Sequence, residues 1–472
     1  MVNRRWLIGG GAAALGAAAV VGGVWMSGSG GDVVPGRARA RRISTDVKLP
    51  ETVDVAIVGG GVIGAFTAYY LARQGVTVAL FEKGAIGGEA SGRAQGQVSS
   101  AGLDPVKLPL INHAKTLWAG INAEIGGETG YRRNGLTYGI RDPREAEYWE
   151  GWVETAKGLA PHARLLSARE AGALLPGAKP WLGAFNDSSD GGVEPTLAAP
   201  AIAEAARRAG AHIVAPCAVR GFETEAGAVS HVVTERGSVR AKAIVLAGGA
   251  WSTLFADSIG LKLPSLNVFS TVMRVDGVKN GPEGNFEVWG AGARHQLDGS
   301  YTLGVSKGRI AVTPEMLGQL WDFRSVLLSP PWDVQPHLGP YFFEQICQKR
   351  RWRLDEVTPF EQRRILQPSV NSAVVKQVRK RIRQEFPAFA QMNVIETWTG
   401  AINATPDNKP VISAVRDRPG LFLATGFSYG MTMGPAVGQS MADLVLNKTP
   451  SLDLSPYRYE RFIDGSKLAF TA

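Results

Sequence analysis

Cysteine and histidine are scarce in this chain. Its 472 residues include two cysteines, Cys217 and Cys347, and six histidines that lie far apart in the sequence. Two cysteines cannot build a disulfide framework or a cysteine-rich zinc site, so we expect both to be buried as small apolar side chains. The histidines lack the spacing of metal ligands, and no Ser/His/Asp set stands out. We therefore predict no metal site.

Charge is also moderate. Charged residues make up 20% of the chain and hydrophobic residues 45%, which excludes a largely disordered protein, and the 58 glycines follow no G-X-Y period. The net charge of +9 includes a basic run at residues 376–383. No cluster of aromatic residues accompanies that run, so we expect a solvated or lipid-facing helix and no nucleic-acid partner. The length allows two or three folded units.

The N-terminal segment differs from the rest of the chain. Leu7–Met26 is a run of twenty apolar or small residues, long enough to cross a hydrocarbon core of about 30 Å. Arg4 and Arg5 precede it, as in the twin-arginine signals with which bacteria export folded proteins. No small-x-small site follows directly, so we predict that residues 1–31 are an uncleaved single-pass anchor in the bacterial inner membrane, with a cleaved signal as the alternative. The twin arginines favour the periplasmic side for the folded part, although the arginines of the tether at 32–50 argue for the opposite orientation.

A glycine-rich turn after a buried strand is the strongest motif. The apolar run Val53–Val58 predicts the strand, and a G-x-G-x-x-G sequence follows it. The first glycine allows a tight turn, the second lets a pyrophosphate approach backbone N–H groups, and the third lets a helix pack closely on the strand. The residues that we expect to hold the pyrophosphate are Gly59, Gly61, Val62, Ile63 and Gly64.

The rest of this unit follows in register. Ala65–Gln74 has the apolar spacing of a helix, Gly75 ends it, and Val76–Phe81 predicts a second strand that leads to Glu82. The helix N-terminus would face the phosphates, and the Glu82 carboxylate can accept hydrogen bonds from both ribose hydroxyls. Strand, helix, second strand and acid together predict dinucleotide binding.

Three later segments extend the nucleotide site. Residues 84–97 form a Gly/Ser/Gln loop, the apolar strand 243–246 ends in AGGAWS, and the strand 421–424 leads into TGFSYGMTMGP. A helix then continues over Ala436–Val445, and its positive end would stabilise a reduced flavin. The further residues that we expect to contact the cofactor are Lys83, Ser91, Gly92, Gln95, Gly96, Gln97, Val219, Gly248, Trp251, Gly426, Gly430, Met431 and Thr432.

These motifs together resemble the D-amino-acid-oxidase superfamily of FAD amine oxidoreductases, over about residues 52–448. A narrower similarity is to the membrane-bound bacterial L-amino acid deaminases, which share the run Trp352–Gln362, the segment Glu385–Phe389 and the pair Pro406-Asp407. The resemblance implies a non-covalent FAD and the oxidative deamination of an L-amino acid to a 2-keto acid and ammonia. No cysteine stands where covalent sarcosine oxidases attach their flavin.

The resemblance also implies a mixed α/β (α+β) fold, in which a Rossmann-like FAD-binding domain is interleaved with a substrate domain whose antiparallel sheet covers the flavin. The segments that we assign to the FAD-binding domain are 51–105, 190–262 and 395–448. Those that we assign to the substrate domain are 106–189 and 263–394. Within the latter, residues 314–364 resemble a small inserted, membrane-proximal subdomain, with an ordinary subdomain core as the alternative. Residues 449–472 are left as a C-terminal tail.

The substrate site departs from the deaminase pattern. An α-carboxylate usually pairs with an arginine fork, but where the deaminases place an arginine this chain carries Lys307. Arg294 is the other candidate cation, although either residue is more often a surface charge. Asn408 stands where those enzymes carry an acid. The residues that we predict to serve catalysis or to contact substrate are Gln97, Arg294, Lys307, Tyr429 and Met431.

The predicted partners are an amino acid substrate, membrane lipid and a quinone or cytochrome as electron acceptor. The acceptor follows from the anchor, because an oxidase that releases hydrogen peroxide needs no attachment to a membrane. The first alternative is a D-amino acid, N-methyl amino acid or opine dehydrogenase or oxidase of the same superfamily, which the altered carboxylate region favours. The second is a non-catalytic flavoprotein relay subunit.

Overall fold

The computed structural model describes residues 36, 40–288, 290–305, 308–328, 334–337 and 340–471. The predicted anchor at 1–31, the tether residues 32–35 and 37–39, and Lys307 lie outside these residues. No helix in the described part of the chain is both long and apolar enough to cross a bilayer.

The smaller of two large sheets carries the glycine-rich turn. It has eight strands, ordered β19-β20-β11-β1-β2-β8, with β10 paired to β11 and β9 to β10. The strands β20, β11, β1, β2 and β8 run parallel, as the strand–helix–strand unit requires. The bounds are β1 (Thr52–Val58), β2 (Val78–Phe81), β8 (His212–Val214), β9 (Val219–Glu225), β10 (Ala228–Thr234), β11 (Gly237–Leu246), β19 (Val411–Ala414) and β20 (Leu421–Thr425).

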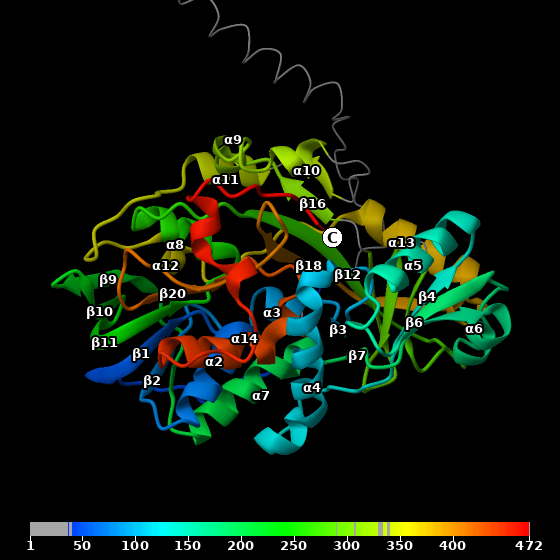
Figure 1. Cartoon of the computed structure of the whole chain (residues 1–472), viewed down its shortest axis with the longest axis horizontal. Coiled ribbons are helices and arrows are strands. Elements are labelled where there is room, and N and C mark those ends of the chain that lie inside the picture. Colours follow the sequence, from blue (N-terminus) through cyan, green and yellow to red (C-terminus); the bar gives the residue numbers. More distant parts are fainter. Residues whose placement is uncertain are drawn as a thin grey trace, which may run out of the picture.

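Four helices pack together against one face of this sheet (Figure 1). They are α2 (Val62–Ala72), α4 (Leu108–Ile125), α7 (Pro195–Arg208) and α14 (Gly430–Val445). The closest approach is between α14 and α2, where a Cβ on Gly438 would lie 2.4 Å from the Phe66 Cβ. A glycine is therefore required there. The strands β1 and β20, which precede the two helices, run parallel, so both helix N-termini lie at the same end of the sheet.

The larger sheet has ten strands and is mostly antiparallel. Its order is β17-β16-β12-β15-β14-β13-β4-β6-β5, with β18 paired to β12. The pairs β13–β4 and β16–β17 are parallel, so the predicted antiparallel sheet is in fact mixed. The bounds are β4 (Leu136–Ile140), β5 (Ala163–Ser167), β6 (Gly183–Asp187), β12 (Leu266–Asp276), β13 (Asn285–Val288), β14 (Ala291–His295), β15 (Tyr301–Val305), β16 (Gly308–Ala311), β17 (Val334–His337) and β18 (Asn393–Ala404).

Short elements connect and cover the two sheets. The strands β3 (Gln97–Val98) and β7 (Gly191–Gly192) pair with each other between them. The basic run at 376–383 lies in α13 (Ser372–Glu385), which buries Val375, Val378 and Ile382 against the larger sheet. The predicted boundary at 395 falls inside β18, which pairs with β12 along its length, so the start of that segment belongs to the larger sheet. Four further helices are α3 (Ala90–Arg93), α5 (Pro143–Thr155), α6 (Ala168–Leu174) and α8 (Ser252–Ser258).

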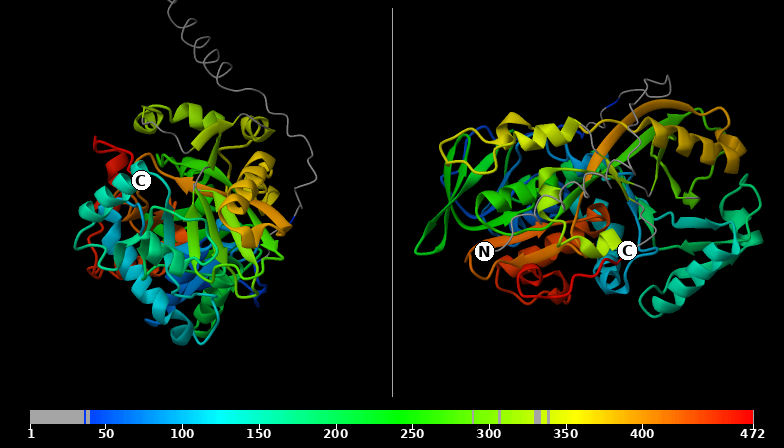
Figure 2. Two further views of the ribbon diagram at one scale, coloured as in Figure 1. Left: turned by 90° about the vertical axis from the view of Figure 1, so that its right-hand side faces the viewer. Right: turned by 90° about the horizontal axis from the view of Figure 1, so that it is seen from above.

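The inserted segment 314–364 contributes four short helices, α9 (Pro314–Gly318), α10 (Arg324–Leu328), α11 (Pro340–Ile346) and α12 (Pro359–Gln362). Of these, α9, α10 and α11 lie at the top of Figure 1, whereas α12 lies lower, beside α8. Helices of this segment are also at the top of the left-hand view of Figure 2. Cys347, just after α11, is exposed, which corrects the prediction that both cysteines are buried; Cys217 is buried. The described part of the tail, 449–471, is anchored to the fold by Arg461, which is buried in an ion pair with Asp407.

Candidate active site

The glycine-rich turn joins β1 to α2 as the sequence predicts. Gly59 has φ of +113°, and a Cβ there would lie 2.5 Å from the carbonyl oxygen of Ala247. A Cβ on Gly64 would lie 2.0 Å from the Gly59 carbonyl oxygen, so α2 can approach the turn only with glycine at that position. The Val62 N–H donates to the Ser91 hydroxyl at 2.9 Å, which brings Ser91 to the helix N-terminus where a phosphate would bind.

Glu82 follows β2 and faces the same turn. Its carboxylate accepts hydrogen bonds from the N–H groups of Gly60 at 2.8 Å and Gly84 at 2.7 Å. Burial raises the pKa of this carboxyl, and these two N–H groups act in the opposite direction. The carboxylate is thus fixed in place, with lone pairs left for the ribose hydroxyls of a dinucleotide.

The Lys83 side chain contacts other groups of the protein. Its ammonium pairs with Glu89 at 2.9 Å, donates to the Arg364 carbonyl at 2.6 Å and lies 4.3 Å from the centroid of the Trp251 ring. It therefore supports the loop after Glu82 and the predicted cofactor residue Trp251.

A cavity of about 760 Å³ runs from the glycine-rich turn to the larger sheet. The predicted residues that line it are Gly59, Gly61, Val62, Ile63, Glu82, Lys83, Ser91, Gln95, Gly96, Gln97, Val219, Gly248, Trp251, Tyr429, Gly430, Met431 and Thr432. Gly64, Gly92 and Gly426 lie behind this wall, where close backbone or side-chain contacts leave no room for a Cβ. The structure therefore brings residues from three distant parts of the chain to one cavity.

The helix α14 begins at Gly430 rather than at Ala436. Pro435 has no N–H to donate to the Met431 carbonyl, which argues against a helix through this position. The Trp118 indole N–H supplies the missing donor, at 3.1 Å from the carbonyl oxygens of both Met431 and Thr432. The first turn of α14, with no side-chain cap from Tyr429, therefore lies in the cavity wall, where its N–H groups can stabilise a reduced flavin.

Two glutamine side chains lie between the glycine-rich turn and the larger sheet. The Nε2 atoms of Gln95 and Gln97 are buried and have no hydrogen-bond partner among the described residues. They lie over Gly292 and Gly304, which face each other in β14 and β15, and a Cβ on Gly292 would be 2.8 Å from Gln95 Nε2. Buried amide donors without an acceptor are costly, so this part of the cavity fits a bound group that accepts hydrogen bonds.

The far end of the cavity has an aromatic wall. Tyr138, Trp149 and Tyr429 line it, with Glu287 beside Tyr138 in the register of β13 and β4. The Tyr138 and Trp149 ring centroids are 4.8 Å apart, and Tyr429 is 38% exposed at the mouth. This end is suited to a large apolar side chain.

Asn408 also lines the cavity. It has φ of +55°, its side-chain oxygen accepts from Ser428 at 2.7 Å, and its amide donates to the Thr471 carbonyl at 3.0 Å. The amide that replaces the deaminase acid is therefore held by the loop before α14 and by the C-terminal segment.

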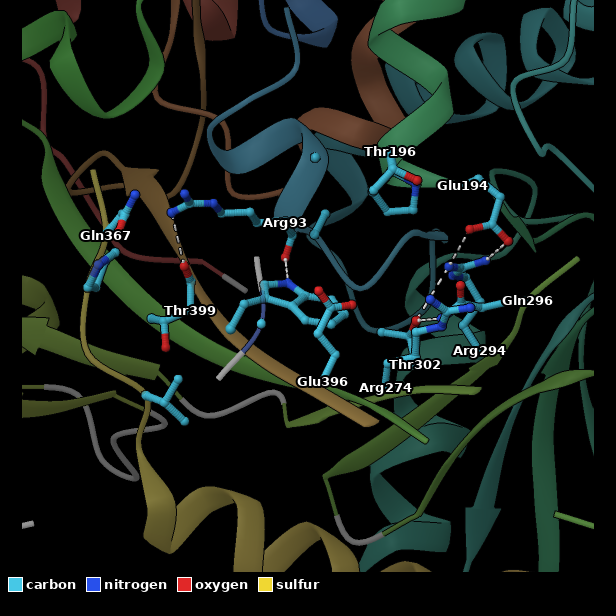
Figure 3. A pocket seen from close by; sticks show the side chains of 17 residues that line it. Arg93, Glu194, Thr196, Arg274, Arg294, Gln296, Thr302, Gln367, Glu396 and Thr399 are labelled. Carbon is cyan, nitrogen blue, oxygen red and sulfur yellow. Dashed lines mark hydrogen bonds and ion pairs between the residues drawn. The ribbon is translucent and has the colours of Figure 1, made fainter. Parts of the chain in front are cut away.

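Arg294 lies outside this cavity, in the wall of a second one of about 840 Å³ (Figure 3). Its guanidinium forms a bidentate pair with Glu194 at 3.0 and 3.1 Å, and its Nε donates to the Gln95 carbonyl at 2.7 Å. Both side chains are buried, at 3% and 9% exposure. Arg294 therefore holds the glutamine loop from behind, and its charge is compensated by Glu194. Lys307 lies outside the described residues.

Several lining residues had no signal in the sequence. Tyr138, Trp149 and Glu287 come from three separate segments, on β4, α5 and β13, that only the tertiary fold brings together. Ser99 could have been suspected, because it follows the predicted cofactor residue Gln97 by two positions.

Comparison with known proteins agrees with this geometry. The family model described as FAD dependent oxidoreductase (DAO) matches residues 54–444. The structure of L-amino acid deaminase from Proteus myxofaciens in complex with anthranilate has a TM-score of 0.87 and 36% identity, over 91% of this chain and 98% of that one. Glycine oxidase of Geobacillus kaustophilus is 26% identical over 87% of this chain and 97% of its own length. The chain spans only 42% of the length of mouse mitochondrial sarcosine dehydrogenase, with 24% identity.

The glycine turn, the fixed Glu82 carboxylate and the first turn of α14 all fit FAD. The family match covers the segments that carry them. The chain belongs to the DAO family of FAD dependent oxidoreductases and is an FAD-dependent oxidoreductase that acts on amino groups.

Proposed function

We propose that this protein oxidatively deaminates L-amino acids with bulky apolar side chains to 2-keto acids and ammonia. The likeness to a Proteus L-amino acid deaminase over nearly the whole of both chains carries the proposal. The aromatic wall formed by Tyr138, Trp149 and Tyr429 supports a bulky side chain, because it offers a large apolar surface at the end of the cavity.

Bound FAD supplies the acceptor for the hydride that leaves the substrate α-carbon. The residues of the chain bind and aim the substrate. The Nε2 groups of Gln95 and Gln97 donate to the α-carboxylate, and the aromatic wall holds the side chain so that the α-C–H bond points at the flavin. Met431, which is 7% exposed, contributes an apolar surface that excludes water.

A second candidate is a D-amino acid, N-methyl amino acid or opine dehydrogenase of the same family. The position of Arg294 favours it, because this cation is paired with Glu194 outside the cavity. Arg93 lines the cavity, but its guanidinium donates to the carbonyls of Leu366 and Thr399. A carboxylate held by amides is bound less tightly than one held by an arginine fork, which would relax the preference for an unsubstituted L-amino acid.

We further propose attachment to the bacterial inner membrane, with the catalytic part on the periplasmic side and electrons passed to a quinone or cytochrome. The inserted segment supports lipid contact, since the exposed large apolar side chains in its described part are Leu317, Leu320, Trp321, Phe343, Ile346 and Val357. Trp321 is 75% exposed, which suits insertion at an interface. The basic residues Lys349, Arg350 and Arg353 form ion pairs with acidic residues of the chain. Apolar contact rather than unpaired positive charge would therefore dominate the binding of lipid.

Anaerobic bleaching of the flavin tests the function. Detergent-extracted protein is mixed with L- and D-forms of phenylalanine, leucine and lysine, with sarcosine and with an opine, and the loss of flavin absorbance is recorded. Bleaching by L-phenylalanine and L-leucine alone is expected. Bleaching by D- or N-substituted substrates would select the second candidate, and a flavin that no amine reduces would leave only a relay subunit.

Vesicle binding tests the membrane contact. Trp321→Ser should weaken binding to vesicles of anionic lipid, whereas Tyr148→Ser, away from the insertion, should not.

A further inference from the structure

A cluster of buried charged side chains lies behind the wall of the substrate cavity. The oxidation proposed above gives none of these side chains a role. Lys115 on α4 lies between Asp187, at the end of β6, and Asp190, in the turn before β7. The Lys115 Nζ is 3.1 Å from Asp187 Oδ2 and 2.8 Å from Asp190 Oδ1, and the three side chains are 6%, 1% and 0% exposed. Burying each ion costs several kcal/mol, so stability alone is a weak reason for such a cluster.

The cluster can bind one more proton. One ammonium faces two carboxylates, so the cluster is neutral only when one carboxyl is protonated. Burial raises the pKa of Asp190 to about 6, and the neighbouring Asp187 charge adds to this effect. Burial also disfavours the Asp187 carboxylate, but Lys115 and Ser189 outweigh it and lower the Asp187 pKa. The extra proton therefore belongs on Asp190. The titratable and hydroxyl groups that face Asp190 are those of Lys115, Asp187, Ser99, Ser100, Tyr131 and Tyr138.

Ser99 connects this carboxyl to the cavity. Its hydroxyl donates to Asp190 Oδ2 at 2.8 Å, and Ser99 itself lines the cavity. Its backbone N–H donates to Thr432 Oγ1 at 3.3 Å, which ties it to the first turn of α14 on the cofactor side. The Ser99 hydroxyl also interacts with the phenol of Tyr138, whose pKa burial raises well above its ordinary value. Tyr138 thus stays protonated, so the base that the Ser99 hydroxyl contacts is Asp190 and not Tyr138.

The neighbouring Ser100 offers an internal comparison. Its hydroxyl donates to Asp187 Oδ2 at 2.9 Å and accepts from Lys115 Nζ at 2.9 Å, within the same cluster. It is fully buried and is not among the residues that line the cavity. Only one of two adjacent serines in this cluster therefore reaches the substrate side.

We propose that Ser99 passes the proton that the bound substrate ammonium group releases to Asp190, which Lys115 and Asp187 hold in position to receive it. This inference rests on the proposed function, since oxidation by a flavin requires the neutral amine. The ammonium N–H bond breaks as an O–H bond forms on Ser99, directly or through one water. The original Ser99 O–H bond breaks as an O–H bond forms on Asp190. The amine keeps its lone pair, and no electrons pass to the protein in this step.

The composition of the cavity wall supports this assignment. No histidine is among the described residues that line the cavity, so the usual proton acceptor near neutral pH is missing from its wall. A carboxylate with a pKa of about 6 is ionised at neutral pH and still basic enough to take a proton from an ammonium group that is held beside it. Asp190 is a positioning and proton-accepting residue behind the wall, and Ser99 is the group that would touch substrate.

The test uses the full-length FAD-loaded protein and the amine that bleaches the wild type fastest. Anaerobic stopped-flow rates of flavin reduction are measured from about pH 5 to pH 10 for the wild type, Ser99→Ala and Ser100→Ala. In the wild type the rate should fall on the acid side with a midpoint near pH 6. Ser99→Ala should lose about 100-fold at pH 7, and its midpoint should move toward the pKa of the free amine. Ser100→Ala keeps the route through Ser99, so it should lose less than about threefold, and its midpoint should rise only by the loss of the Ser100 hydrogen bond to Asp190.

An infrared titration tests the acceptor without substrate. The difference between wild type and Asp190→Asn, both FAD-loaded, should contain a carboxyl signal that appears on acidification with a midpoint near pH 6. Absence of that signal overturns the proposal, whether or not any amine reduces the flavin. Equal pH profiles for Ser99→Ala and Ser100→Ala overturn it as well and leave the oxidation intact. A wild type that no amine bleaches refutes the proposed function, and with it the transfer, even when the carboxyl signal is found.

Discussion

Replacing Arg294 by methionine separates two roles for this residue, a structural ion pair and a substrate contact. Methionine keeps the volume of the side chain but leaves Glu194 as a buried anion whose remaining donor is the Leu297 N–H at 3.0 Å. Two unit charges about 4 Å apart interact by about 4 kcal/mol at an effective dielectric constant of 20. This agrees with the 3–5 kcal/mol that removal of one partner from a buried pair typically costs. We therefore expect the free energy of unfolding to fall by about 4 kcal/mol.

Urea unfolding of the FAD-loaded protein, followed by tryptophan fluorescence, measures this loss. Arg274→Met is the matched control, because Arg274 pairs with Asp298 where the two side chains are 31% and 52% exposed, and such pairs contribute at most about 1 kcal/mol. The double variant Arg294→Met/Glu194→Leu removes both charges and should recover most of the stability. An Arg294→Met variant that is as stable as Arg274→Met but has lost substrate affinity would refute the reasoning and restore Arg294 as a substrate contact.

Three further predictions concern the cofactor, a buried carboxyl and the two thiols. Gly64→Ala should reduce FAD affinity at least tenfold, measured as flavin retained on dialysis, because its Cβ would meet the Gly59 carbonyl; Gly120→Ala in α4, where a Cβ meets nothing within 4 Å, controls for the loss of a glycine. Asp190 has its folded pKa raised from 3.8 to about 6, so the folded state binds the extra proton between these values, and the free energy of unfolding that this group contributes falls by about 3 kcal/mol as the pH rises from about 3 to about 7; Asp190→Asn should abolish this contribution in urea titrations at each pH. A thiol reagent should label one cysteine per native chain, Cys347, and two after denaturation, and labelling of Cys217 in the native protein would contradict its burial.

The cofactor-binding residues could be predicted from the sequence, because the contacts that require each of them lie within a short stretch of the chain. Gly59 and Gly64 are required by backbone contacts within one strand–helix turn, and Glu82 follows the next strand. The start of α14 was missed for a non-local reason. The carbonyl that Pro435 leaves without a donor is satisfied by Trp118, more than three hundred residues away in the chain, and no window around residue 430 contains that information.

The substrate-binding residues were harder to predict from the sequence, because their neighbours in space are also far away in the chain. Arg294 was a reasonable candidate by residue type, but a guanidinium in an alternating strand gives no indication of whether it meets a ligand or a carboxylate such as Glu194, 100 positions away. Tyr138 and Glu287 become neighbours only through the parallel pairing of β4 and β13. Local patterns specify strands and turns, whereas the order of strands in a sheet decides which side chains share a cavity.

The order of segments in the FAD-binding half has a consequence for biosynthesis. β1 and β2 leave the ribosome early, but their neighbours β11 and β20 follow only at Gly237 and Leu421, and the flavin-facing turn of α14 begins at Gly430. At the usual 5–20 residues per second, about 20 to 70 s of translation separate the glycine-rich turn from α14. The nascent chain must stay unassembled through that interval, and FAD can be locked in only when translation is almost complete. FAD can therefore be enclosed by the finished chain and not by the growing one.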